Sequence, residues 1–295
     1  MITDFRLQVF DTVARELSFT RAAEVLSISQ PAVTKHIKEL ERLLSTPLFR
    51  RSGNRIALTE QGEMLRRYVK DILDGYGRLS DAVSESRGDY YGHLKIGAST
   101  TIMQYILPDI LAHFKRRYPS VEVTLIGGNS QEVLLEVESG RVDVALVEDA
   151  HTSSSFHYEH FAEDKVVMVS AHNSKESITV DKLVKLPLVL RENGSGTLEV
   201  IIRELQRHGI SRRMLNIEMQ IGSSEGIVRY LKLSKCYALI SEAAVRDYIK
   251  RGELHVVDVD NLDIVRSLRF ATLHGYRSRI VDLFITFCLE YHYNQ

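Results

Sequence analysis

The stretch FTRAAEVLSISQPAVTKHIKELE, residues 19–41, decides the fold of the first part of this chain. We expect it to form two short helices joined by a tight turn. The second helix is amphipathic, because its apolar residues recur at steps of four, three and four and share one face: Val33, Ile37, Leu40 and Leu44. Small Ala22 and Ala23 allow the first helix to pack closely against it.

The opposite face of the second helix offers short polar and cationic side chains, which suits the major groove of DNA. A glutamine can pair bidentately with adenine, and a proline can contact a thymine methyl. We expect Gln30, Pro31 and Thr34 to contact base edges. Lys35 and Lys38 can reach bases or phosphates, and Thr20 and Arg21 are expected to contact the DNA backbone. The alternative is a helical hairpin with a solvated charged face, which the same spacing also fits.

A second short motif follows these helices. Residues 50–59 read RRSGNRIALT, in which Gly53-Asn54 is a turn dipeptide between two segments able to pair as short strands. Such a hairpin beside a recognition helix is a wing, and arginines on it can reach phosphates or the minor groove. We expect Arg51 and Arg55 to contact DNA in this way, which favours DNA binding over the plain hairpin.

The chain resembles the LysR-type transcriptional regulators. The resemblance rests on the order and spacing of short blocks: FRLQVF at 5–10, Ala14, SFTRAA at 18–23, SQPAVTKHI at 29–37, Leu40-Glu41, Leu44, PLF at 47–49, Arg51 and LTEQG at 58–62. It implies an α+β multidomain chain with a winged helix-turn-helix, a long linker helix and a two-subdomain α/β effector domain like the periplasmic binding proteins. The implied bounds are 1–58 for the DNA-binding domain, 59–88 for the linker and dimerisation helix, 93–162 with 267–295 for effector subdomain I, and 163–266 for effector subdomain II.

The segment after the wing has a heptad-like seam. Its apolar residues alternate steps of four and three: Leu65, Val69, Ile72, Tyr76, Leu79 and Val83. An ordinary helix packed on its own domain fits this pattern too, but the segment bridges two differently patterned regions, so we expect a partner helix from a second subunit. Such a homodimer would read an imperfect palindrome in double-stranded DNA. The family adds a homotetramer and contact with RNA polymerase as expectations.

From about residue 93 onward, strands alternate with helices, which favours a mainly parallel sheet. The first set is a strand at 93–97, a helix at 101–118, a strand at 121–126, a helix at 130–139 and a strand at 142–147. The second set has strands at 165–170, 186–190, 217–221 and 236–240, helices at 198–208, 225–233 and 242–248, and a return through a strand at 267–273 to a closing helix at 279–291. Two crossovers, near 161–164 and 264–268, are implied by the resemblance.

Three strand-to-helix junctions carry hydroxyl groups beside small residues. In open α/β sheets, ligands bind outside the carboxyl ends of the strands, where helix N-termini attract anions. The candidates are Ser99, Thr100 and Thr101; Ser195, Gly196 and Thr197; Ser223 and Ser224; and Gly128 with Asn129, which could close the same site. A plain helix N-cap explains each junction taken singly.

The family places a small-molecule effector between the two subdomains, so these positions become candidate effector contacts. We expect the effector to be a small anionic metabolite that modulates the DNA-bound regulator. The segment RENGSGT at 191–197 resembles the subgroup that includes sulfur-assimilation and carbon-fixation regulators.

Composition fits a basic DNA-binding end on an acidic body. The formal net charge is −1, and residues 1–58 carry nine Lys/Arg against six Asp/Glu, or +3, which leaves −4 for the rest. Cys236 and Cys288 lie in apolar runs and are expected to be buried thiols. No stretch approaches the roughly 20 apolar residues of a membrane helix, and no signal peptide is visible. We therefore expect a cytoplasmic protein without a membrane partner.

Enzymatic motifs are absent from the sequence. There is no GxSxG, HExxH, CxxC or phosphate-binding glycine loop. His157 and His160 would face opposite ways on a strand, which argues against a metal site. We expect no catalytic residue, no metal and no cofactor. A solute-binding protein shares the two-lobed architecture, but it would need an export signal and would lack the winged module.

Overall fold

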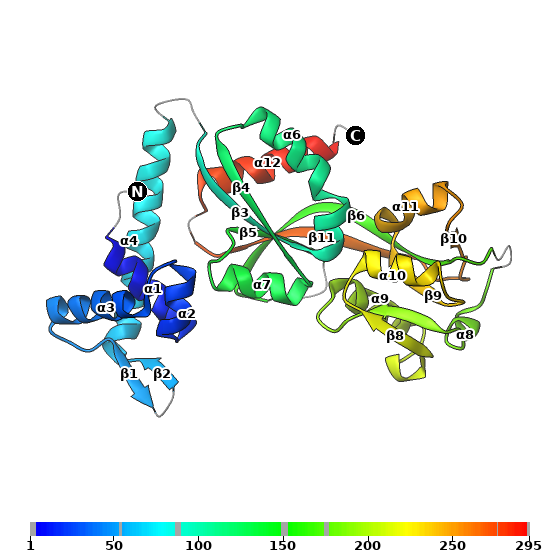
Figure 1. Ribbon diagram of the computed structural model, residues 1–295, viewed down its shortest axis with the longest axis horizontal. Coiled ribbons are helices and arrows are strands. Elements are labelled where there is room, and N and C mark those ends of the chain that lie inside the picture. Colours follow the sequence, from blue (N-terminus) through cyan, green and yellow to red (C-terminus); the bar gives the residue numbers. More distant parts are fainter. Residues whose placement is uncertain are drawn as a thin grey trace. The chain divides into compact units, whose positions relative to one another are not determined.

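The computed structural model of the protein describes residues 4–52, 55–85, 90–148, 153–173, 177–275 and 277–293. The chain divides into two compact units (Figure 1). The first consists of Met1–Gly92, Glu138–Arg141 and Gly275–Asp282, and the second of His93–Val137, Val142–His274 and Leu283–Gln295. In the part of the chain that the structure describes, no helix is both long and apolar enough to cross a membrane.

The first unit is a winged helix-turn-helix followed by a long helix. Its elements are α1 (Phe5–Glu16), α2 (Phe19–Val25), α3 (Gln30–Leu44), β1 (Phe49–Ser52), β2 (Arg55–Leu58) and α4 (Glu60–Glu85). Side chains of Asp4, Ser18 and Ser29 accept backbone N–H groups at the starts of the three short helices, as N-caps do. The strands β1 and β2 pair antiparallel as the predicted wing, while the predicted turn residues Gly53 and Asn54 lie outside the described residues.

The predicted apolar face of α3 is confirmed at three positions and wrong at the fourth. Val33, Ile37 and Leu40 are buried, whereas Leu44 is 45% exposed. The helix ends at Ser45, whose left-handed backbone (φ 50°) turns the chain back toward the core. The Glu41 carboxylate then accepts the backbone N–H of Leu48 at 2.8 Å. Leu48 rather than Leu44 therefore fills the core, and it is 1% exposed.

The long helix α4 carries one broad apolar stripe, which its own domain covers only in part. Val69 is buried in the core of the winged domain, and Leu65 and Leu73 pack against the same core. The rest of the stripe leaves large apolar side chains in solvent: Met64, Tyr68, Ile72 and Leu79. The predicted seam is therefore divided, because Leu65 and Val69 are used within their own domain. The Val83 side chain lies outside the described part.

The second unit is built on one sheet with strand order β4-β3-β5-β11-β6-β9-β7-β8, to which β10 adds by pairing with β6. The strands are β3 (Gly92–Ser99), β4 (Val121–Gly128), β5 (Val144–Glu148), β6 (Phe156–Ser170), β7 (Leu188–Arg191), β8 (Ile217–Ile221), β9 (Tyr237–Ser241), β10 (His255–Val256) and β11 (Ile264–Leu273). Parallel pairing joins β3 to β5, and β7 to both β8 and β9. Two lobes result: the first lobe holds β3, β4 and β5, and the second holds β7, β8 and β9.

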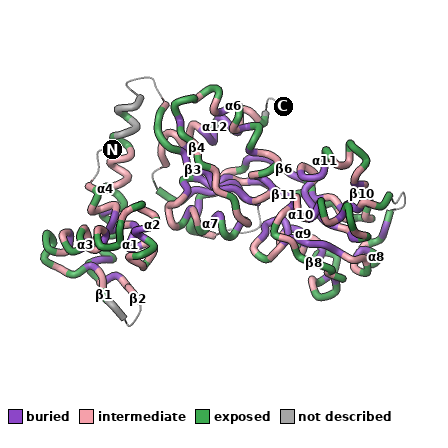
Figure 2. The backbone as a smooth tube through the Cα atoms, viewed as in Figure 1, coloured by how far each residue is buried: buried purple, intermediate pink, exposed green. Residues whose placement is uncertain are grey.

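Helices cover both lobes. The first lobe carries α5 (Thr100–Tyr105), α6 (Leu107–Arg117), α7 (Ser130–Glu138) and α12 (Arg279–Tyr293), and the second carries α8 (Val180–Leu183), α9 (Gly196–Arg207), the 3-10 turn Arg212–Met214, α10 (Ser224–Leu231) and α11 (Glu242–Lys250). In the first lobe, α6 and α12 lie on one side of the strands and α7 on the other (Figure 1). The central strands are buried between them (Figure 2).

Two predicted element bounds need correction. The single helix expected at 101–118 is two helices, because the helix is distorted at Ile106 (φ −116°) and Pro108 stands in the first turn of the next helix. The strand expected at 165–170 starts much earlier, at Phe156, and includes His157 and His160. Among the described residues, no group of three His, Cys, Asp or Glu side chains could hold a metal ion. Both cysteines are free and buried, as predicted.

The two crossovers are the long antiparallel strands β6 and β11. Their register runs from Ile264 opposite Val166 to Leu273 opposite Phe156, so each strand serves both lobes. At one end β11 pairs with β5 of the first lobe, and at the other β6 pairs with β9 of the second. This arrangement is the two-subdomain sheet that the resemblance implied.

A buried ionic cluster sits where these strands pass from lobe to lobe. The Arg266 side chain, on β11, is 0% exposed and donates from Nη1 to Glu148 at 3.2 Å and from Nε to Asp164 at 2.8 Å. Glu148 ends β5, and Asp164 lies on β6. Arg266 also donates to the hydroxyl of Thr197 on α9 at 2.6 Å. One guanidinium thus connects both crossover strands, the first lobe and the second.

Hydroxyl groups complete the environment of Glu148. Ser99 donates to one carboxylate oxygen at 3.0 Å and Ser130 to the other at 2.5 Å. Burial alone would raise the pKa of the Glu148 carboxyl, but the Arg266 charge and these hydrogen bonds hold that pKa below its ordinary value. Glu148 is therefore a carboxylate in the folded protein.

Replacing Arg266 by methionine should destabilise the second unit by roughly 3–5 kcal/mol near pH 7, because it leaves two buried carboxylates without their cation. The loss should shrink as the pH falls from about 7 to 5. In the variant, burial without a cation raises the pKa of Glu148, so the folded protein gains a proton in that window. In the wild type, the lowered pKa keeps the contribution of Glu148 to stability constant in that window. This contribution is lost only at lower pH. Thermal unfolding followed by circular dichroism measures both effects.

Arg207→Met is the matched control, because the Arg207 side chain is 69% exposed and pairs with Glu204 on the same helix. It should change stability by less than about 1 kcal/mol at either pH. An Arg266→Met variant that melts like this control would show that the buried cluster does not hold the lobes.

Candidate functional site

The exposed face of α3 carries the residues predicted to meet base edges. Gln30 and Pro31 are exposed and Thr34 is half-buried. The Gln30 side-chain amide donates to the Thr34 hydroxyl at 3.2 Å, and that hydroxyl donates to the backbone carbonyl oxygen of Gln30 at 3.1 Å. An amide has two N–H groups and an oxygen acceptor, so this arrangement orders the side chain and still offers a donor and an acceptor to a base.

The remaining candidates of the DNA-reading surface surround this helix. Lys35 and Lys38 are exposed along α3, and Thr20 and Arg21 are exposed in the first turn of α2. The backbones of Arg51 and Arg55 lie on the paired strands of the wing, and the side chains of these two arginines are outside the described part. The turn between α2 and α3 is tight and has Ser27 in the left-handed region (φ 53°). This turn fixes the orientation of α3 relative to α2.

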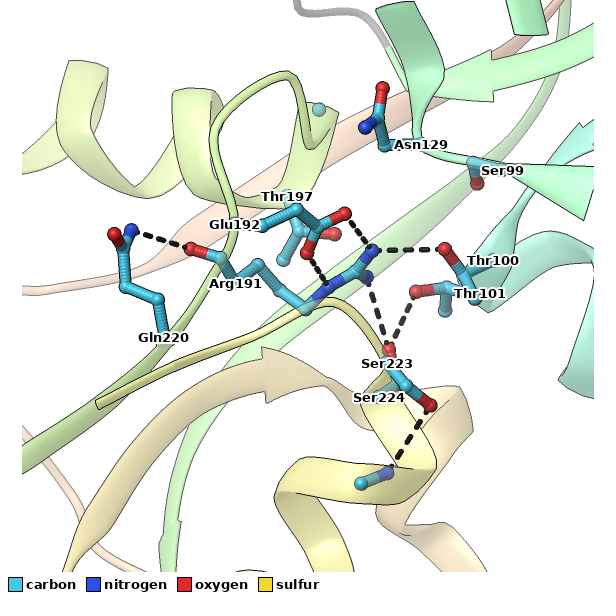
Figure 3. Close-up of polar contacts among 12 residues, drawn as sticks. Ser99, Thr100, Thr101, Asn129, Arg191, Glu192, Thr197, Gln220, Ser223 and Ser224 are labelled. Carbon is cyan, nitrogen blue, oxygen red and sulfur yellow. Dashed lines mark hydrogen bonds and ion pairs between the residues drawn. The ribbon is translucent and has the colours of Figure 1, made fainter. Parts of the chain in front are cut away.

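The second candidate site lies where the two lobes meet. Its centre is Arg191, at the end of β7, which is 2% exposed. Arg191 donates from Nη2 to the Thr100 hydroxyl of the first lobe at 2.9 Å and from Nη1 to the Ser224 hydroxyl of the second at 3.3 Å (Figure 3). Thr101 and Ser224 hydroxyls lie 3.0 Å apart, so they also join the lobes. We call these four residues, with Glu192, the lobe junction.

A second set of contacts crosses between the lobes at the start of α7. The backbone N–H of Gln131 donates to the Gly194 carbonyl at 3.2 Å, and that of Gly196 donates to the Ser130 hydroxyl at 3.2 Å. Gly194 has a φ of 85°, and a Cβ there would come within 3.0 Å of the Asn129 amide oxygen. A glycine is therefore required both by the backbone and by the close approach of the first lobe.

A third set pairs two tyrosines with one carboxylate. Glu225, in the first turn of α10, accepts from the Tyr105 hydroxyl of the first lobe at 3.1 Å and from the Tyr248 hydroxyl. Burial, together with the hydrogen bond to Glu225, raises the pKa of Tyr105, so it remains a neutral donor. Arg229 pairs with the same carboxylate from solvent.

The predicted effector residues have different surroundings. Thr100, Thr101 and Ser224 meet at Arg191. Ser99 and Thr197 contact Glu148 in the ionic cluster, and a Cβ at Gly196 would lie 2.8 Å from Glu148. The others are accounted for locally: Ser223 caps Gly226, Asn129 caps Glu132, the Gly128 carbonyl accepts from Thr100, and Ser195 is buried.

Sequence reasoning missed the charged members of both clusters. Arg191 and Glu192 were part of a quoted segment but not of the candidate site, and Glu148 and Arg266 were not considered. A signal existed for Arg191, because an arginine that directly follows the apolar run Leu188-Val189-Leu190 at the carboxyl end of a strand is an unusual neighbour for a core.

Comparison with known proteins identifies the family. The bacterial regulatory helix-turn-helix protein model of the lysR family matches residues 5–63, and the LysR substrate binding domain model matches residues 87–292. A "Probable RuBisCO transcriptional regulator" of Trichormus variabilis is 31% identical over 95% of this chain and 85% of its own length. The "HTH-type transcriptional regulator CysL" of Bacillus subtilis is 30% identical over 90% of this chain and 89% of its own.

A solved structure of the Synechocystis PCC6803 CcmR regulatory domain in complex with 2-PG has the same fold. It is 23% identical, with a TM-score of 0.63, over 69% of this chain and 99% of its own. The family consists of transcriptional regulators rather than enzymes, which agrees with the lack of a catalytic constellation in the sequence. From its two matching domain models and its relatives, the chain belongs to the LysR family of transcriptional regulators, with a helix-turn-helix DNA-binding domain and an effector-binding domain.

Proposed function

We propose that this LysR-family regulator binds an imperfect palindromic operator as a homodimer or homotetramer and that a small anion at the lobe junction sets its activity. The single observation that carries the effector part is the buried guanidinium of Arg191, bonded to hydroxyls of both lobes. A buried cation at helix N-termini is a site for a carboxylate, phosphate or sulfate group.

The relatives suggest which anions to test first. The RuBisCO transcriptional regulator and the regulator CysL are about 30% identical to this chain, and the CcmR regulatory domain was solved with 2-PG. We therefore choose 2-PG as the first probe, with inorganic phosphate, sulfate and succinate as simpler anions. A ligand that joins both lobes can shift their equilibrium only through unequal affinity for two states.

The DNA part of the proposal rests on the exposed face of α3. We assign Gln30, Pro31 and Thr34 to base edges, Lys35 and Lys38 to bases or phosphates, and Thr20, Arg21, Arg51 and Arg55 to the backbone or minor groove. Because the target is chromosomal DNA, we place the protein in the cytoplasm, with RNA polymerase as a further partner at the promoter.

Gln30→Ala should relax specificity at one base position, with a loss of discrimination of roughly 1–3 kcal/mol there. Lys38→Ala should instead weaken binding to all sequences alike and reduce the salt slope by about one. Titrations of both variants on the DNA beside this protein's own gene, and on singly substituted copies, separate the two effects. If Gln30→Ala weakens every site equally, Gln30 is not a base reader.

Ile72→Asp combined with Leu79→Asp should dissociate the dimer and weaken operator binding by roughly 100-fold, since each monomer would hold one half-site. Both side chains are exposed on α4, so the winged domain keeps its core. Arg67→Glu, an exposed charge change on the same helix, is the control. Sedimentation velocity gives the oligomeric state, including any tetramer. An intact dimer in the double variant would place the subunit contact elsewhere.

At least one of the four anions should raise the melting midpoint of the wild-type protein saturably, because a ligand that binds only the folded state stabilises it. The same anion should alter the mobility or footprint of the operator complex. If none of the four changes either property at concentrations up to about 100 times a millimolar dissociation constant, the anion site of this proposal is wrong. The DNA-reading assignments are unaffected by that result.

A further inference from the structure

The lobe junction already contains an anion of its own. Glu192 directly follows Arg191 in the chain and accepts two parallel hydrogen bonds from it, Nε to Oε2 at 2.8 Å and Nη2 to Oε1 at 2.9 Å (Figure 3). We call these two donors the Arg191 fork. A guanidinium fork binds a carboxylate, phosphate or sulfate in this bidentate way.

We propose that Glu192 is a built-in competitor of the effector, whose anionic group displaces the Glu192 carboxylate from the Arg191 fork. This inference rests on the proposed anion site. It adds which group occupies the site when no effector is bound and which chemical class of effector can replace that group. The effector then carries a planar or tetrahedral oxyanion able to accept from both Nε and Nη2.

The need for an anion at this position follows from burial. Arg191 is 2% exposed, and a buried guanidinium without a counter-charge is strongly destabilising. Thr100 and Ser224 supply neutral oxygens only. Among the described residues, the carboxylate paired with Arg191 is that of Glu192. An unliganded protein would otherwise hold an uncompensated charge between its lobes.

Glu192 can give up this position when another anion takes its place. Its side chain is 26% exposed, so the carboxylate can turn into water, whereas Arg191 cannot. Glu192 also stands at the end of β7, where the chain enters a turn rather than another strand. The next residues, Asn193 and Gly194, line a pocket of about 310 Å³, so the segment is not packed on every side.

The exchange explains selectivity by charge. An anionic ligand keeps Arg191 paired when Glu192 leaves, whereas a neutral ligand of the same shape would leave the buried cation unpaired. A carboxylate tethered beside its cation is present at a high local concentration, which raises the concentration of effector needed. Glu192 therefore sets both the threshold and the charge requirement of the site.

Glu192→Gln removes the competing charge and keeps the size of the side chain. We expect it to bind at least one of inorganic phosphate, sulfate, succinate and 2-PG about tenfold more tightly than the wild type, by isothermal titration calorimetry on the full chain. Succinamide, a neutral counterpart of succinate, should bind neither protein. Glu218→Gln, the same change at an exposed position on the neighbouring strand β8, should match the wild type.

Glu192→Asp provides a second variant in case the glutamine protein fails to fold. It keeps the charge but is one methylene shorter, so it holds the fork less well and should give an intermediate affinity. Anions that bind the Glu192 variants no more tightly than they bind the wild type would overturn the competitor role and leave the anion site standing. No binding of any of the four anions to any of these proteins would overturn both.

Discussion

The two-lobed domain depends on one buried guanidinium at its crossover strands. Arg266 neutralises carboxylates that come from β5 and from β6, and it reaches the first turn of α9 through Thr197. Each of these groups would be costly to bury alone, and together they are paired and hydrogen-bonded. A rearrangement of the lobes that separated these groups would therefore be costly.

The second buried arginine differs in what surrounds it. Arg266 is held by two carboxylates on other strands, both almost wholly removed from solvent. Arg191 is held by a single carboxylate, which belongs to the next residue and is partly exposed, and otherwise by neutral hydroxyls. Replacing the partners of Arg266 would require strands to separate, whereas replacing the partner of Arg191 needs one side chain to turn. The same residue type therefore serves as a fixed connection in one place and as an exchangeable site in the other.

How far the sequence led depended on whether a feature was local. The helix-turn-helix followed from the spacing of Val33, Ile37 and Leu40, because three buried residues on one helix face need no other part of the chain to be known. Leu44 has the same spacing, but the prediction that it is buried was wrong, because a left-handed Ser45 and the Glu41 carboxylate bring Leu48 into the core instead. Serines and threonines at strand ends were found, but their partners were not. Spacing cannot tell that Ser99 donates to a glutamate 49 residues away while Thr101 meets a serine 123 residues away.

The same limit explains why α4 was only half understood. A heptad pattern predicts that apolar residues are covered, but it does not say by what. In the structure Leu65 and Val69 are covered by the winged domain itself, while Ile72 and Leu79, with Met64 and Tyr68, remain exposed along the same apolar stripe. Part of the apolar surface of the helix is thus used for folding, and part is left exposed. Because the exposed apolar side chains are not needed by the domain core, they can be replaced by charged ones without unfolding the DNA-binding domain, so the subunit contact proposed above can be tested on a folded protein.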